Sequence, residues 1–305
     1  MKKIAFIFPG QGSQYAGMGK DFYEMFEESR AIFEKASELL GFDIKEIIFE
    51  ENDKLHITEY TQAAMVTTMA AMLAHINTKN IRPYVTAGLS LGEYVALIQS
   101  KVLSVEDAIK LVRKRGIFMQ EAVPLGQGTM AAVLGMESDV VEAICAKTEG
   151  IVSVANYNCP GQVVISGESK AVEKAMKSLG EAGAKRVLPL NVSGPFHSKL
   201  LEVAGENLRQ ELGKVSIQKP DIPYVANVTA EYVMNQKEIL DLLAAQVSSS
   251  VRWQQSVEAM IADGVEVFVE IGPGKTLSSF VKKIDKTKTV INIEKVEDLE
   301  KLKEI

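Results

Sequence analysis

The pentapeptide Gly88-Leu-Ser-Leu-Gly92 restricts the fold of this chain more than any other feature. A short apolar run, Pro83 to Gly88, precedes it and is predicted to be a strand, and a predicted helix follows from Leu91 to Gln99. The chain must turn sharply between them, and a Cβ in place of either glycine would clash. The turn lifts the Ser90 hydroxyl out of the sheet, beside the free amide groups of a helix N-terminus. Ser90 is therefore a candidate nucleophile, although the pentapeptide without this context would be a chance match about as often as not.

Short apolar strands alternate with helices along most of the chain. Ile4–Phe8 is predicted to be a buried strand that ends in the glycine-rich loop Pro9–Gln14. Further strands are predicted at 223–227 and 265–271, and helices at 20–40, 58–76, from 104 onwards, 198–212, 236–246 and 253–263, with a last helix after Gly272-Pro-Gly274. Mixed elements of this kind predict an α/β fold with a mainly parallel, doubly wound sheet.

The segment from residue 126 to 197 has a different order of predicted strands and helices. Its predicted strands lie at 129–134, 151–156, 162–166 and 186–190, and its predicted helices at 138–147 and 169–179. The order β-α-β-β-α-β is that of the ferredoxin-like unit. We therefore expect two domains: a large α/β domain formed by residues 1–125 and 198–305, and an inserted ferredoxin-like small domain formed by residues 126–197.

Composition argues against several classes of function. The chain has 305 residues and a formal net charge of −6, which gives no support for nucleic-acid binding. No apolar run approaches the roughly 20 residues that span a bilayer, and the apolar start ends at Pro9, too early for a signal peptide. The two cysteines, Cys145 and Cys159, form no disulfide framework and suit a cytoplasmic protein. Three histidines without a cysteine or histidine cluster predict no metal site.

Three histidines are candidates for the base that Ser90 would need. His56 lies in a polar stretch predicted to be a solvated loop, and His75 lies in a helix rich in Ala and Met, where a packed or surface position is expected. His197 lies in the turn 193–198 between a predicted strand and a predicted helix, the kind of loop where catalytic residues gather. Alone it would be interpreted as a residue beside a helix cap, but a nucleophilic serine favours it as the base.

A third group should orient the histidine. The acidic residues Asp107 and Asp139 lie between Ser90 and His197 in the sequence, but neither lies in a loop at the end of a strand. We therefore doubt a carboxylate in this place. An uncharged acceptor, such as a backbone carbonyl, could fix the tautomer of the imidazole instead.

Five motifs, taken together, resemble one known family. In chain order they are Pro9-Gly-Gln-Gly-Ser-Gln14, Gly88-Leu-Ser-Leu-Gly-Glu-Tyr94, Arg115-Gly116, Asn156-Tyr-Asn-Cys-Pro-Gly-Gln162 and Gly194-Pro-Phe-His-Ser198. The set resembles malonyl-CoA:acyl-carrier-protein transacylases and, more broadly, the acyltransferase domains of fatty acid and polyketide synthases. The resemblance runs from about residue 3 to Gly274. It implies a large domain similar to an α/β-hydrolase-like core, with the ferredoxin-like domain beside the cleft.

The resemblance implies a role for each catalytic position. Ser90 matches the nucleophile that carries the malonyl ester, and His197 matches the general base. Gln11 and Leu91 match the residues whose backbone amides form the oxyanion hole. Gln246 matches the residue whose backbone carbonyl orients the histidine, which agrees with the expected uncharged acceptor.

Arg115 determines the substrate that we expect. It follows Arg113 and Lys114 near the predicted end of an amphipathic helix, where solvated basic residues are the ordinary interpretation. It also precedes Gly116, a small residue that allows a close approach. Arg115 matches the arginine that binds the malonyl carboxylate in the family, and the guanidinium fork fits a carboxylate with two hydrogen bonds. Phe196 matches the position where phenylalanine goes with malonyl rather than methylmalonyl groups.

The implied reaction is a ping-pong transfer in fatty acid biosynthesis. A malonyl group would pass from malonyl-CoA to Ser90 and then to the phosphopantetheine thiol of acyl carrier protein, with no metal or redox cofactor. Carrier proteins are usually acidic, so a basic patch should flank the cleft, and Lys185, Arg186 and residues 110–114 are candidates for it. No apolar helix face is spare for self-association, so we expect a monomer with no membrane or nucleic-acid partner.

Three other functions stay open at this point. A serine thioesterase or esterase would share the serine and the histidine, but would usually have an acidic third residue and no carboxylate-binding arginine. A free-standing acyltransferase that loads polyketide synthase carrier domains would have the same residues and a different carrier protein. A non-catalytic scaffold is disfavoured by the presence of Ser90, His197 and Arg115 together.

Overall fold

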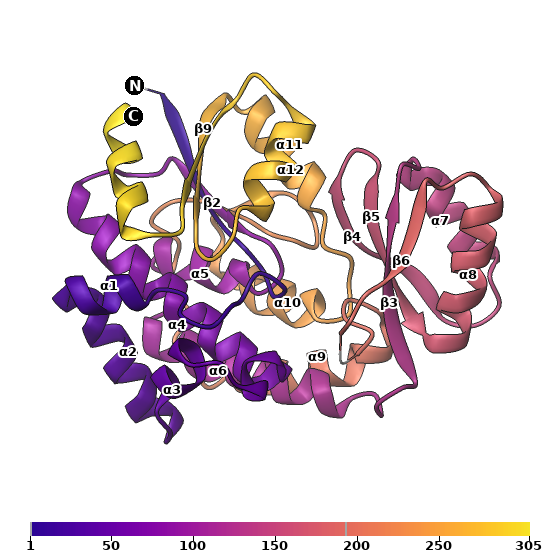
Figure 1. The fold of residues 1–305 in the computed structure, drawn as a ribbon, viewed down its shortest axis with the longest axis horizontal. Coiled ribbons are helices and arrows are strands. Elements are labelled where there is room, and N and C mark those ends of the chain that lie inside the picture. Colours follow the sequence, from indigo (N-terminus) through magenta and orange to yellow (C-terminus); the bar gives the residue numbers. More distant parts are fainter. Residues whose placement is uncertain (1, 193) are drawn as a thin grey trace.

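Two β-sheets, each packed against helices, organise the chain (Figure 1). The computed structural model describes residues 2–192 and 194–305. One sheet has six strands and the other has four. The expected mixed α/β fold with a mainly parallel sheet is confirmed, and a small antiparallel sheet lies beside it. In the described residues, no helix is long and apolar enough to cross a membrane.

The six-stranded sheet follows the order β10-β9-β1-β2-β7-β8. Its strands are β1 Lys3–Phe8, β2 Val85–Gly88, β7 Tyr224–Val225, β8 Tyr232–Val233, β9 Val265–Ile271 and β10 Thr289–Ile293. All neighbours pair in parallel except β8, which runs antiparallel to β7. Along β1, Phe6 and Phe8 belong to one apolar cluster and Ala5 and Ile7 to another, all fully buried. Side chains of a strand alternate between its faces, so both faces of the sheet are covered, as parallel sheets require.

Helices cover both faces of this sheet. The cluster around Phe6 and Phe8 draws on α1 Lys20–Met25, α2 Glu27–Leu40, α3 Ile44–Phe49, α4 Thr58–Ile76, α5 Gly92–Gln99, α6 Val105–Glu121, α9 Glu202–Leu212 and α10 Gln236–Gln246. The cluster around Ala5 and Ile7 draws on α11 Trp253–Ala262 and α12 Thr276–Ile284. Four short 3-10 helices complete this part: η1 Asp53–His56, η2 Asn77–Lys79, η3 Lys199–Leu201 and η4 Val296–Glu304.

The four-stranded sheet is antiparallel and has the order β4-β5-β3-β6. Its elements are β3 Gly128–Leu134, α7 Ser138–Lys147, β4 Val152–Cys159, β5 Gln162–Glu168, α8 Ser169–Glu181 and β6 Arg186–Pro189, which is the predicted β-α-β-β-α-β order. Helices α7 and α8 share a separate apolar cluster with this sheet. Met130, Ala155 and Val164 belong instead to the main cluster of the larger sheet. The small sheet therefore packs its second set of side chains toward the rest of the chain.

A short backbone pairing joins the two sheets. The Val251 amide donates to the Ala155 carbonyl at 2.8 Å, and the Tyr157 amide donates to the Val251 carbonyl at 2.9 Å. The Ser250 hydroxyl adds a 2.6 Å bond to the Val154 carbonyl. These bonds tie strand β4 to the segment that follows helix α10.

The structure differs from the sequence-based expectation in several elements. The predicted helix 20–40 is two helices, because Phe26 is extended with φ −124° and ψ 127°. The Phe26 ring stacks on the His75 ring, with centroids 3.5 Å apart, and this packing favours the break. Helix α6 does not end at the basic triplet but continues to Glu121, so Arg115 lies inside it. The predicted helix 198–212 begins as the 3-10 turn η3. The structure also has elements that were not predicted: α3, η1, η2, β8, β10 and η4.

Strands β1, β2, β7 and β9 all run in the same direction and so end at one edge of the sheet. Two close backbone contacts hold the turn after β2 at this edge. A Cβ added to Gly88 would lie 2.0 Å from the carbonyl carbon of Gly92, and a Cβ added to Gly92 would lie 2.1 Å from the Phe8 carbonyl oxygen. These positions admit only glycine, because the contacting atoms are backbone and cannot move aside. The predicted elbow therefore packs directly on the end of β1.

We expect Gly92→Ala to lower the free energy of unfolding by at least about 3 kcal/mol, because the added methyl group collides with the end of β1. Gly180→Ala is the matched control: Gly180 lies in helix α8 with nothing within 4 Å of an added Cβ, so alanine should stabilise the protein by about 0.5–1 kcal/mol. Urea denaturation of both variants measures the difference. Equal stability of Gly92→Ala and the parent protein would contradict the close packing.

Candidate active site

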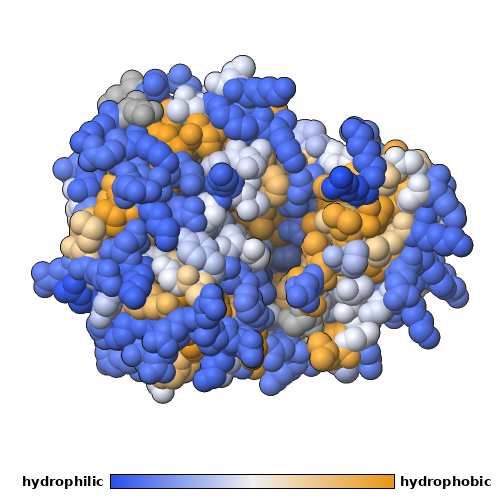
Figure 2. Space-filling model, viewed as in Figure 1, coloured by the Kyte–Doolittle hydropathy of each residue, from blue (hydrophilic) through white to orange (hydrophobic). Residues whose placement is uncertain are grey.

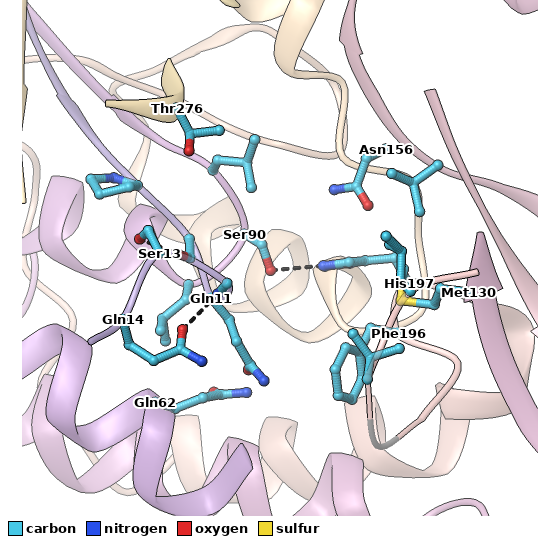
Figure 3. A pocket seen from close by; sticks show the side chains of 18 of the residues that line it. Gln11, Ser13, Gln14, Gln62, Ser90, Met130, Asn156, Phe196, His197 and Thr276 are labelled. Carbon is cyan, nitrogen blue, oxygen red and sulfur yellow. Dashed lines mark hydrogen bonds between the residues drawn. The ribbon is translucent and has the colours of Figure 1, made fainter. Parts of the chain in front are cut away.

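A pocket of about 620 Å³ lies between the two sheets. Its lining comes from the loops at the carboxyl edge of the large sheet, from helices α4, α6 and α12 and from residues of the small sheet. Figure 2 shows the surface hollowed between the larger and the smaller part of the molecule. Figure 3 shows Gln11, Ser90, His197 and Phe196 around this pocket. The structure thus brings together residues that lie far apart in the sequence.

Ser90 and His197 are in direct contact at the centre of the pocket (Figure 3). Ser90 Oγ lies 2.7 Å from His197 Nε2. His197 Nδ1 lies 2.8 Å from the backbone carbonyl oxygen of Gln246. A carbonyl only accepts, so Nδ1 carries the proton and Nε2 is left to accept from the serine hydroxyl. The third group is therefore a backbone carbonyl rather than a carboxylate.

The backbone at both residues is in the left-handed region. Ser90 has φ 51° and His197 has φ 58°. Residues other than glycine adopt this backbone region rarely and at a cost in free energy, and residues that do so are enriched at functional sites. The surrounding contacts thus hold both side chains toward each other against the local preference of the chain.

His197 is neutral in this environment. Burial and, to a smaller extent, the positive charge of Arg115 lower the pKa of His197 to about 4, although backbone hydrogen bonds oppose this shift. An unprotonated imidazole is the form that can accept a proton from Ser90. At neutral pH the imidazole is therefore in the form that can act as a base.

Two loops that carry the expected oxyanion-hole residues meet beside Ser90. Gln11 and Leu91 both line the pocket, and Leu91 is the N-cap of helix α5. A Cβ added to Gly10 would lie 2.6 Å from the Leu89 carbonyl oxygen, so the two backbones are in contact. This contact places two backbone segments on one side of the nucleophile, where amide groups can stabilise an oxyanion.

Arg115 lies beside Ser90, and its exposed fraction is 1%. Its Nη1 donates to Gln62 Oε1 at 2.9 Å, and its Nη2 donates to Gln246 Oε1 at 3.1 Å and to Ser90 Oγ at 3.2 Å. Its Nε is buried and has no partner in the described residues. No carboxylate forms an ion pair with Arg115 anywhere in residues 2–192 and 194–305. Burial lowers its pKa, but a guanidinium stays protonated in proteins, so the site contains an uncompensated positive charge.

The residues next to Arg115 have structural partners. Arg113 Nη2 lies 2.7 Å from a Glu59 carboxylate oxygen, and Lys114 Nζ lies 2.9 Å from one of Glu211. A Cβ added to Gly116 would lie 2.7 Å from the Glu59 Cα. The close approach that Gly116 allows is therefore that of helix α4, not of a ligand, and Arg113 and Lys114 are ion-paired rather than simply solvated.

Phe196 forms the pocket wall beside His197 (Figure 3). It is buried and lines the pocket together with Met130 of strand β3. Both side chains are apolar, so this wall restricts the size of the group next to the serine. Ser193, at the start of the predicted 193–198 turn, lies outside the described residues.

The other two histidines are not brought to Ser90. His75 is buried, with Nδ1 2.7 Å from Glu28 Oε1 and its ring on Phe26. His56 is exposed at the end of η1 and lies at the lining of the same pocket. Cys145 and Cys159 are buried free thiols.

Three residues of the site were not predicted: Gln62, Glu93 and Asn227. All three are buried. Glu93 is an acidic residue in an otherwise apolar helix three residues after Ser90, which is a signal that could have been used. Asn227 follows the end of a parallel strand, where polar residues gather around sites. Gln62 had no comparable signal, because it lies inside a long helix without polar periodicity.

Comparison with known proteins agrees with this geometry. Residues 5–301 match the family described as acyl transferase domain. A malonyl CoA-acyl carrier protein transacylase of Bacillus subtilis is 45% identical over 304 residues, which cover 98% of this chain and 96% of that protein.

Solved structures agree as well. The crystal structure of a malonyl CoA-acyl carrier protein transacylase from Clostridium perfringens has a TM-score of 0.95 at 48% identity, covering 99% of this chain and 96% of that one. A malonyl-transacylase in complex with its type II PKS acyl-carrier protein has a TM-score of 0.95 at 37% identity, covering 97% of each chain. With the serine–histidine pair in place, these matches mean that the chain is an enzyme and belongs to the acyl transferase domain family.

Proposed function

We propose that this enzyme transfers a malonyl group from malonyl-CoA to the phosphopantetheine thiol of an acyl carrier protein, in fatty acid biosynthesis, through a malonyl ester on Ser90. The observation that carries the proposal is the buried Arg115 guanidinium beside Ser90 Oγ, whose hydrogen-bond acceptors among the described residues are all neutral. The names of the relatives support the same substrate and carrier.

Arg115 favours an acyl group that brings its own carboxylate. Gln62 and Gln246 fix the guanidinium without neutralising it, so its charge stays available to a substrate. A buried charge left unpaired costs about 3–5 kcal/mol, which corresponds to roughly two to four orders of magnitude in preference for malonyl over acetyl. Phe196 narrows the space next to the α-carbon and disfavours methylmalonyl, by a factor of about 10–200 for one methyl group.

The first half-reaction acylates the enzyme. Ser90 Oγ attacks the thioester carbonyl carbon while His197 Nε2 accepts the hydroxyl proton. The amides of Gln11 and Leu91 donate to the oxyanion of the tetrahedral intermediate. The intermediate collapses with cleavage of the carbon–sulfur bond, and His197 returns the proton to the departing thiolate of coenzyme A. The Gln246 carbonyl stabilises the imidazolium that forms in between.

The second half-reaction repeats these steps in reverse order. The phosphopantetheine thiol gives its proton to His197, and its sulfur attacks the ester carbonyl on Ser90. Cleavage of the ester bond returns the proton to Ser90 Oγ and leaves the malonyl group on the carrier. A thioester is already activated for acyl transfer, so these steps use no metal or redox cofactor.

We propose that the two sheets mark two domains: an α/β-hydrolase-like large domain of residues 1–125 and 198–305, and a ferredoxin-like small domain of residues 126–197. The strand order and the separate apolar cluster of the small sheet support this division. Exposed basic side chains on strand β6 and the preceding loop, Arg186 and Lys185, stay candidates for contact with an acidic carrier. A monomeric, cytoplasmic enzyme remains the expectation, and two free thiols are consistent with a reducing compartment.

A second candidate carrier is that of a polyketide synthase. The relative solved with a type II PKS acyl-carrier protein favours it. The same acylated serine would serve both carriers, so the two differ only in the protein that docks. Competition between purified carrier proteins of the two kinds for one malonyl-enzyme separates these possibilities.

Ser90→Ala should abolish acyl-enzyme formation, because among the described residues only the Ser90 hydroxyl is a nucleophile hydrogen-bonded to His197. Intact mass spectrometry after mixing with malonyl-CoA should show a gain of one malonyl group on the parent enzyme and none on the variant. Addition of phosphopantetheinylated carrier should then discharge the parent. Loss of the group to water alone would indicate a thioesterase, and labelling of the variant would indicate another nucleophile.

Arg115→Met should reverse the acyl preference, because it removes the charge and keeps much of the volume. We expect kcat/KM for malonyl-CoA to fall by about 100- to 1,000-fold, while transfer from acetyl-CoA is kept or increased. Arg113→Met is the matched control, since the partly buried Arg113 pairs with Glu59, and it should leave the preference unchanged. An equal fall for both acyl groups in Arg115→Met would mean that Arg115 is only structural.

On the acid side of the pH–rate profile, activity should be lost only at unusually low pH. The neutral imidazole is the active form, so a His197 pKa of about 4 moves the loss of activity to lower pH. We expect kcat/KM for malonyl-CoA at pH 5.5 to stay within about twofold of its value at pH 7.5, whereas an ordinary histidine would be about 90% protonated there. The bound malonyl carboxylate offsets Arg115, so the acid limb of kcat should lie above that of kcat/KM. A limb near pH 6.5 in kcat/KM would contradict the neutral buried base.

A further inference from the structure

A buried acid that the reaction does not use lies one helical turn from the nucleophile. Glu93 belongs to the first turn of α5 and is 1% exposed. Its Oε2 accepts from Gln246 Nε2 at 2.6 Å and from the backbone amide of Asn227 at 3.3 Å. It touches neither Ser90 Oγ nor His197 by any hydrogen bond of the described residues. Burial of an acidic side chain costs free energy, and two donors bind this one. We therefore expect Glu93 to have a role of its own.

The side chain of Gln246 connects Glu93 with Arg115. Its Nε2 donates to Glu93 Oε2 and, at 2.9 Å, to the Ser90 carbonyl oxygen. Its Oε1 accepts from Arg115 Nη2 at 3.1 Å. The amide fits in one orientation only, because a guanidinium only donates and the Ser90 carbonyl only accepts. Reversal of the amide would set acceptor against acceptor and donor against donor.

Asn227 extends these contacts to both sides of the elbow. Its Oδ1 accepts from the Ser90 amide at 2.6 Å, and its Nδ2 donates to the Gly88 carbonyl at 2.7 Å. Together, Asn227 and Gln246 bind both the amide and the carbonyl of Ser90. These are the groups that hold the left-handed φ of the nucleophile, and Glu93 accepts from both residues.

We propose that Glu93 is a positioning residue that couples capture of the substrate carboxylate at Arg115 to the attack geometry of Ser90, acting through the Gln246 side chain. Arg115 and the Ser90 carbonyl set the orientation of the Gln246 amide. By accepting from Gln246 Nε2, Glu93 holds this amide in place between them. The inference rests on the proposed function, because it concerns preference for a carboxylated acyl group.

The charge of Glu93 is not what the role requires. Burial raises the pKa of Glu93 to about 8, although the bond from Gln246 opposes this. The neutral acid therefore predominates at pH 7, keeps an acceptor for Gln246 and leaves the charge of Arg115 uncompensated. Glutamine has the size of the neutral acid and retains a carbonyl acceptor, whereas leucine has a similar volume and no acceptor.

The test uses Glu93→Gln, Glu93→Leu, Gln246→Met and the double variant Glu93→Leu/Gln246→Met. Each full-length enzyme is assayed for kcat and KM with malonyl-CoA and with acetyl-CoA, and its thermal midpoint is recorded. Ile239→Ala serves as the matched control for stability, because Ile239 is fully buried two turns away on the same helix α10 and is outside these hydrogen bonds. The parent enzyme must first form the malonyl ester on Ser90; if it does not, the proposed function itself fails.

We expect Glu93→Gln to stay within about threefold of the parent for both acyl groups. Glu93→Leu should lose about 10- to 100-fold in kcat/KM for malonyl-CoA, because the Gln246 donor is left unpaired. Its loss for acetyl-CoA should be about tenfold smaller, so that the malonyl preference falls by that factor. In the Gln246→Met background, Glu93→Leu should reduce the preference no further, as expected of residues that act through one contact. Ile239→Ala should lower the thermal midpoint and leave the preference unchanged.

Three results would overturn the inference while the parent still forms its malonyl ester. The first is a Glu93→Leu enzyme whose malonyl preference equals that of the parent, as for Ile239→Ala. The second is a Glu93→Gln enzyme as impaired as Glu93→Leu, which would assign the role to charge instead of to the acceptor. The third is full additivity of the two substitutions in the preference. If Glu93→Leu does not fold, the malonyl preference of Gln246→Met is compared with that of Glu93→Gln. The first variant removes the contact between the two side chains and the second retains it.

Discussion

The contact between Gly92 and the Phe8 carbonyl is the constraint on which the site depends. It presses the turn after β2 onto the end of β1, so the loop that carries Gln11 and the turn that carries Ser90 share one edge of the sheet. Parallel strands bring their carboxyl ends together, and the site of an open α/β sheet forms there. Asn227, just after β7, and Thr276, at the start of α12, lie at the same edge. A single pair of glycines thus aligns segments that are remote in the sequence.

The unpaired charge of Arg115 gives this edge its chemical character. The protein surrounds the guanidinium with amide oxygens and a hydroxyl, which bind it without cancelling it. The same charge helps to keep His197 neutral. In the proposed reaction, this buried cation has two roles: it selects an acyl group with a carboxylate, and it keeps His197 unprotonated before that group binds. The arrival of the carboxylate partly releases the base from this repulsion, which suits the imidazolium that forms during acylation.

Much of this could be predicted from the sequence, and the omissions have physical causes. The elbow, the strands of the large sheet and the small β-α-β-β-α-β unit have local signals, namely glycine spacing and apolar runs. The break at Phe26 has no such signal, because apolar residues keep helical spacing through it. The Phe26 ring stacks on His75, which is distant in the sequence. The position of Arg115 inside α6 was mistaken for a helix end for a similar reason, since basic residues also favour helix ends. The role of the Gln246 side chain depends on the Ser90 carbonyl, 156 positions away in the sequence, so no local pattern predicts it.

The backbone pairing between β4 and Val251 has a mechanical consequence. Residue 251 follows the end of α10 by a few residues, and α10 ends at Gln246, whose carbonyl holds the tautomer of His197. The small sheet cannot swing away from the large one without breaking these two bonds or pulling on that segment. The width of the cleft and the basicity of the histidine are thus linked by one segment of main chain. A position of the small sheet that admits a long pantetheine arm must preserve the hydrogen bonds of this segment for His197 to act as the base.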